Sequence, residues 1–141
     1  MKIFFFFLAF TSLINSKAQT DFTNDTISII NTMEICETVS IKHQSNGCFG
    51  SSKDSIEIIK TESDYLLVYG KNEYHITSKK IKLLINFEDE LHQNHNGGCS
   101  TIDSYEILNE NTNEFYTTND STCSWHGFTK LIEKLKLKKT S

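Results

Sequence analysis

The sequence predicts an α+β domain, in which an antiparallel β-meander and a β-hairpin form a sheet that is covered by two helices and stapled by disulfides. Three observations lead to this fold class. Apolar side chains alternate with polar ones in short segments between residues 38 and 76, and again between 102 and 118. They recur at helical spacing within 81–91 and 128–135. Four cysteines follow an apolar N-terminal run.

The first residues are typical of a secretory signal peptide. Lys2 precedes an apolar run over 3–10, which is too short to span a bilayer at about 20 residues. Small residues at Ser16 and Ala18 match a signal peptidase site, so we expect cleavage after Ala18, with Gln19 as the alternative. The interpretation is a signal peptide over 1–18 and a single exported domain over 19–141. We therefore expect a secreted or periplasmic protein with no stable membrane anchor after cleavage.

The charge of the mature domain argues against nucleic acid as a partner. Without Lys2 and Lys17 the chain keeps 12 basic residues against 18 acidic ones, a net charge of −6 with neutral histidines, and it contains no arginine. A nucleic-acid-binding domain shows a basic face, usually rich in arginine. The expected partner is instead an unknown protein or an envelope component.

The first half of the mature chain predicts the meander, after a loose polar arm over 19–26. A Gly/Ser/Asn-rich loop is expected over 45–52. A polar corner at 62–64 and a tight turn at 70–72 join the later strands. The predicted strands cover residues 27–30, 38–43, 55–59, 65–69 and 74–76.

The second half alternates helix, hairpin and helix. Ser78 is a plausible N-cap for a helix over 81–91, and the glycines of 92–98 end it. Segments 102–108 and 114–118 flank a turn-like polar tetrad and predict a hairpin. The last helix is the clearest amphipathic segment, with apolar side chains at i, i+3, i+4 and i+7. These are Phe128, Leu131, Ile132 and Leu135.

The cysteines predict disulfides, because an even number occurs in a small exported chain. Cys99 and Cys123 face each other across the open end of the predicted hairpin, so we expect them to be bonded. Cys36 and Cys48 remain as the second pair. That pairing conflicts with a continuous strand between them, which would carry the chain about 25 Å away.

Histidines form the only candidate metal site. His92 and His95 precede Cys99, and His126 follows Cys123. Imidazole and thiolate are zinc and copper ligands. We expect no metal, because bonded cysteines are not thiolates and because His92 and His95 lie in an exposed loop that ends a helix.

No complete catalytic motif is present: the chain has no G-x-S-x-G elbow, and its carboxylates Glu88, Asp89 and Glu90 are successive on one helix. The leading hypothesis is a non-catalytic exported binding module without a cofactor, which recognises or inhibits an extracytoplasmic macromolecule. The alternative is a small enzyme or metal-dependent protein that uses the region of His92, His95 and His126.

Overall fold

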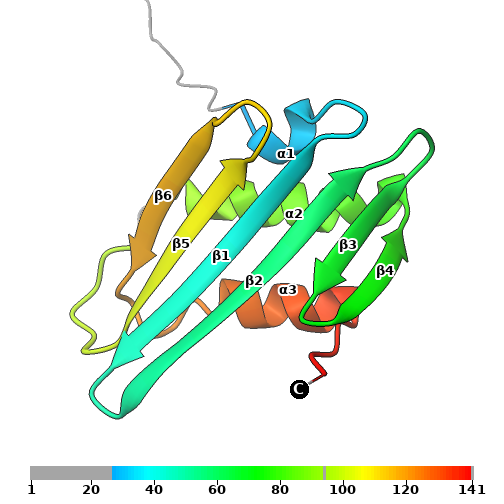
Figure 1. Ribbon diagram of the computed structural model, residues 1–141. Coiled ribbons are helices and arrows are strands. Elements are labelled where there is room, and N and C mark those ends of the chain that lie inside the picture. The colour runs from blue at the N-terminus through cyan, green and yellow to red at the C-terminus, as the bar shows by residue number, and fades with distance from the viewer. Residues whose placement is uncertain (1–26, 94, 141) are drawn as a thin grey trace, which may run out of the picture.

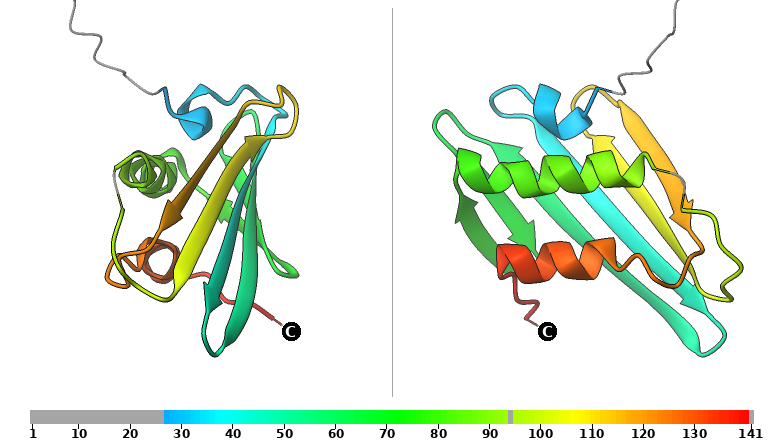
Figure 2. Two further views of the ribbon diagram at one scale, coloured as in Figure 1. Left: turned by 90° about the vertical axis from the view of Figure 1, so that its left-hand side faces the viewer. Right: turned by 180° about the vertical axis from the view of Figure 1, so that it is seen from behind.

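The structure is a computed structural model that describes residues 27–93 and 95–140. The predicted signal peptide over 1–18 and the polar arm over 19–26 lie outside the described residues. The described chain forms a six-stranded antiparallel sheet with helices on one face (Figures 1 and 2). The predicted α+β class is confirmed. No helix in this described part is long and apolar enough to cross a membrane.

The elements follow one another in the order α1, four strands, α2, two strands and α3. Their order across the sheet is β4-β3-β2-β1-β5-β6. The helices are α1 (Ile29–Thr32), α2 (Ser78–Leu91) and α3 (Gly127–Leu135). The strands are β1 (Thr38–Gly47), β2 (Gly50–Lys60), β3 (Tyr65–Tyr69), β4 (Asn72–Ile76), β5 (Ile102–Asn109) and β6 (Phe115–Asp120).

Strand β1 is central because it pairs on both sides. It forms a hairpin with β2, and β5 returns after α2 to pair with its other edge, from Val39 opposite Asn109 to Asn46 opposite Ile102. The predicted meander therefore corresponds to β1–β4, and the predicted hairpin corresponds to β5 and β6.

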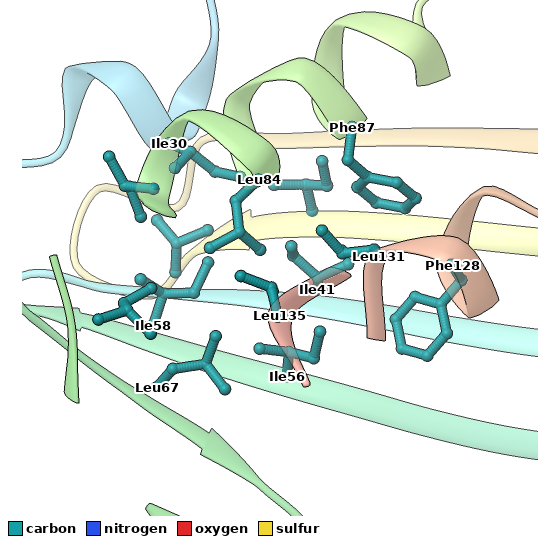
Figure 3. Packing of buried hydrophobic residues seen from close by; sticks show 14 of the residues in the cluster. Ile30, Ile41, Ile56, Ile58, Leu67, Leu84, Phe87, Phe128, Leu131 and Leu135 are labelled. Carbon is teal, nitrogen blue, oxygen red and sulfur yellow. The ribbon is translucent and has the colours of Figure 1, made fainter. Parts of the chain in front are cut away.

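The core lies between the sheet and the helix layer. Ile41, Ile56 and Ile58 of the central strands are completely buried beneath α2 and α3 (Figure 3). From α3, Phe128, Leu131 and Leu135 are at most 4% exposed. Each such side chain contributes roughly 1.5–3 kcal/mol by leaving water. The apolar stripe predicted for the last helix is thus the stripe that docks it on the sheet.

Residues 27–30 were predicted as a strand, and here the prediction is wrong. Residues 29–32 form the single-turn helix α1, whose N-cap Ser28 accepts a hydrogen bond from Asn31 N at 3.1 Å. The free amides of Ile29 and Ile30 donate to the carboxylate of Glu88 in α2, at 2.7 and 3.1 Å. Since this acceptor lies about 60 residues away in the chain, local periodicity carries no trace of it.

The prediction of a loop over 45–52 is also wrong. Both strands run through it, and only Cys48 and Phe49 form the turn between Gly47 and Gly50. The pairing with β5 extends along β1 to Asn46, and its hydrogen bonds stabilise a strand that the local composition does not predict. The hairpin projects beyond α3 at the lower end of the sheet (Figures 1 and 2).

The predicted Cys99–Cys123 disulfide is present, with its Cα atoms 5.6 Å apart. The predicted Cys36–Cys48 pair is not formed, since both thiols are free and exposed. These residues lie at opposite ends of β1, and a strand of that length spans about 33 Å. The conflict that the sequence raised is resolved in favour of the long strand.

Candidate functional site

The helices leave one face of the sheet uncovered, and polar side chains collect on it. Side chains alternate between the two faces of a strand, so Lys42 and Gln44 of β1 both point to the helix-free face. The register sets Lys42 between Ser55 and Glu106 of the neighbouring strands. Glu106 in turn lies opposite Thr117 of β6, so four strands contribute to one polar surface.

This surface is hollowed into a depression of about 640 Å³ over β2, β1, β5 and β6. The backbones of those strands form its floor, with Gly70 and Lys139 at one side. The side chains that alternation directs into it are those of Lys42, Gln44, Lys53, Ser55, Ser104, Glu106, Thr117 and Asn119.

Two kinds of polar group line the depression. Lys42 Nζ and Glu106 form an ion pair at 2.7 Å, but both side chains are about half exposed, so the pair contributes at most about 1 kcal/mol. Lys53 has no ion-pair partner among the described residues. The other side chains are neutral hydroxyls and amides, which donate and accept hydrogen bonds. This set suits recognition of a polar surface.

The C-terminal segment after α3 closes one side of the depression. Lys139 bonds the carboxylate of Asp54, and this hydrogen bond raises the pKa of the Lys139 ammonium. Gly70 has φ +64°, and a Cβ there would lie 3.1 Å from Lys139 Cγ. A glycine is therefore favoured where the turn after β3 meets the C-terminal segment.

The helix-covered face holds a second group of polar atoms, around His43. Its ring stacks with Tyr105 at 5.0 Å and with Phe128 at 4.7 Å between centroids. Asp103 Oδ1 lies 3.6 Å from His43 Nε2, beyond hydrogen-bonding distance. Burial, followed by the charge of Asp103, raises the pKa of Tyr105. Because Phe128 covers the imidazole, His43 is part of the packing between α3 and the sheet.

A smaller hollow of about 490 Å³ lies between α2 and α3. Trp125 stacks there with Phe87 and His95, and its indole Nε1 donates to Glu90 at 3.2 Å. A Cβ on Gly127 would lie 2.2 Å from the Trp125 ring, so the indole rests directly on the glycine backbone. The Trp125 side chain thus packs against other parts of the same domain.

The structure does not bring the three candidate histidines together. His92 packs against Tyr116, with 4.0 Å between centroids, whereas His95 packs against Trp125 at 4.3 Å. His126 is exposed at the N-cap of α3. Among residues 27–93 and 95–140 there is no group of three histidine, cysteine or carboxylate side chains suited to a metal ion. The alternative of a metal-dependent protein gains no support from this geometry.

The depression was missed at the sequence level. Its residues occupy every second position of predicted strands, which is also the pattern of an ordinary solvent-facing side. A signal was nevertheless available, because two helices can cover only one face of a six-stranded sheet. Comparisons of the chain with protein-family models, with curated proteins and with solved structures find no match.

Proposed function

We propose that this protein is an exported binding domain without catalytic activity, which recognises an extracytoplasmic macromolecule through the helix-free face of its sheet. The observation that carries the proposal is the depression of about 640 Å³ on that face. Its walls come from four adjacent strands of a disulfide-stapled domain, so its shape is set by the sheet.

The chemistry of the walls favours a polar partner surface. Ser104 and Asn119 offer neutral hydrogen-bonding groups, and Lys53 offers a positive charge that no carboxylate of the described chain neutralises. Exposed polar residues on a rigid scaffold are common in recognition sites, because little conformational entropy is lost on binding. An enzyme inhibited from this face is one class of partner that fits.

The proposal is tested by affinity capture from the extracytoplasmic fraction of the producing organism, using matched variants. Ser104→Tyr fills the depression from β5 with a residue that strands accept readily. Thr129→Tyr adds the same group on the exposed side of α3 and is the control. We expect the unaltered protein and Thr129→Tyr to retain one partner, and Ser104→Tyr to bind it at least about tenfold more weakly, a change of about 1.4 kcal/mol.

Two results would overturn this function. One is equal recovery of the partner by all three proteins, which would place the binding surface elsewhere. The other is the absence of any specific partner together with hydrolytic or transfer activity of the purified protein, which would favour a small enzyme.

A further inference from the structure

Strand β6 forms one edge of the sheet, and its outer backbone groups pair with no other strand of the described residues. Asn109 N donates to Glu114 O at 2.8 Å across the hairpin, so even-numbered residues of the second strand point their backbone groups toward β5. The odd-numbered residues Phe115, Thr117 and Asn119 therefore point their N–H and C=O groups away from the sheet. These groups find no partner in the described part of the chain.

The outward direction of odd-numbered backbone groups continues past the end of β6 to Ser121, where these groups form hydrogen bonds. Ser121 N donates to His95 O, and Cys99 N donates to Ser121 O, both at 3.0 Å. The loop before β5 thus occupies the position that a neighbouring strand would take at Ser121. It leaves the edge from Phe115 to Asn119 open.

The opposite edge of the sheet is better protected. Strand β4 has only five residues and carries Glu73. The C-terminal segment crosses beside it, where Tyr74 Oη and Asn72 Nδ2 donate to Lys138 O at 2.9 and 2.7 Å. Short length, charge and a covering segment are the usual means by which proteins prevent edge pairing. Strand β6 is only one residue longer than β4, but its stretch from Phe115 to Asn119 contains no lysine, no proline and no charged side chain, and no segment of the described residues covers it.

We propose that β6 pairs antiparallel with β6 of a second copy of this chain, about a two-fold axis at Thr117, and so joins two sheets into one. The proposal does not rest on the proposed function, although Thr117 and Asn119 also line the depression. It requires only that the outward backbone groups of two identical strands meet.

The composition of the edge favours a second copy because the strand complements itself. About an axis at Thr117, Thr117 lies opposite its own copy and Phe115 lies opposite Asn119. Odd residues thus face odd residues, as the hydrogen-bonding groups require. Threonine pairs across antiparallel strands are favourable, and no like charges meet between Phe115 and Asn119.

The ring of Phe115 is a second feature of this edge. It is 67% exposed at the start of β6, and pairing with a second strand would reduce that exposure. The next pair outward would set Glu114 opposite Asp120, which marks the limit of the pairing. Asp120 is 4% exposed and accepts a hydrogen bond from Thr122 N at 2.8 Å, so its side chain is already engaged within its own protomer.

Sedimentation equilibrium of the purified protein is the direct test. The exposed thiols of Cys36 and Cys48 are first blocked with iodoacetamide, so that intermolecular disulfides do not contribute. Thr117→Pro removes an outward N–H and leaves the bonds to β5 intact, whereas Thr117→Val keeps the N–H and is the control. We expect twice the monomer mass for the parent and the valine variant, and a dissociation constant at least about 100-fold higher for the proline variant.

A second substitution covers the case in which proline perturbs folding. Thr117→Lys sets two positive charges across the axis, and Thr129→Lys on α3 matches its charge. We expect only Thr117→Lys to give monomers. A parent protein that stays monomeric up to about 100 µM would overturn the proposal. So would equal dimerisation of folded Thr117→Pro or Thr117→Lys.

Discussion

Replacing Glu88 with glutamine tests how a single buried carboxylate holds α1 on the domain. Glu88 is completely buried. Its Oε2 accepts from Ser28 Oγ and Ile30 N, and its Oε1 accepts from Ile29 N at 2.7 Å. Glutamine offers one oxygen in place of two. With that oxygen at the Oε2 position, its NH₂ group would face the Ile29 amide, donor against donor.

The magnitude follows from these contacts. A hydrogen bond to a charged group is worth about 1.5–3 kcal/mol, and a buried donor left without a partner costs about 1–3 kcal/mol. Glu88→Gln should therefore destabilise the docked state of α1 by about 2–3 kcal/mol. Glu88→Ala removes all three hydrogen bonds to the carboxylate and should have a larger effect. Its loss of stability is limited to the free energy of detaching α1, which would expose the buried side chains of Ile29, Ile30 and Met33.

Hydrogen exchange measures the local loosening of α1, and urea unfolding measures the loss of global stability. The exchange protection of the Ile29 and Ile30 amides should fall by roughly 30–160-fold in Glu88→Gln, the equivalent of 2–3 kcal/mol. Asp89→Asn, on the exposed side of the same helix, is the control and should leave both the amide protection and the free energy of unfolding unchanged. Unaltered protection of the two amides, or a loss of global stability below about 0.5 kcal/mol, would refute this account of the carboxylate.

Three further predictions concern the Cys99–Cys123 disulfide, Gly127 and the loss of stability at acidic pH. Cys123→Ser opens a cross-link between residues 24 apart and should lower the free energy of unfolding by about 3 kcal/mol in urea titrations, with first proteolytic cleavage near residues 119–127. Gly127→Ala should displace Trp125 and red-shift its fluorescence, because the new Cβ would overlap the ring. Hydrogen bonds from Glu34 N and the Asn109 amide lower the pKa of Glu37, so its stabilising contribution is present above the ordinary carboxyl pKa and lost as the pH falls below it. Glu37→Gln should accordingly flatten the fall in urea midpoint on acidification, and an unchanged pH profile would contradict that role.

The elements that could be predicted from sequence are those whose information is local. The last helix shows its apolar stripe within nine residues, and the β5–β6 hairpin shows two alternating segments around a polar turn. The Cys99–Cys123 bond follows from that hairpin register. Each of these depends on neighbours that are close in the chain.

The elements that could not be predicted depend on distant partners. Residues 45–52 have the composition of a loop, and they are strand because β5 pairs with β1 as far as Asn46. Residues 27–30 have a strand-like apolar composition, but residues 29–32 are helical because Glu88 accepts the free amides of Ile29 and Ile30. The polar depression likewise exists only once four strands lie side by side, in a register that no single segment contains.

The central place of β1 has a consequence for the order of folding. The pairs from β1 to β4 join neighbours in the chain, whereas β5 must return across α2 to reach β1, whose paired residues lie 56 to 70 positions earlier. Contacts at that separation form late, because the connecting chain must be closed before they give any stability. Strand β1 is therefore expected to wait as an exposed edge until residues 102–109 arrive. For a chain delivered N-terminus first, that interval is when aggregation competes most strongly with folding.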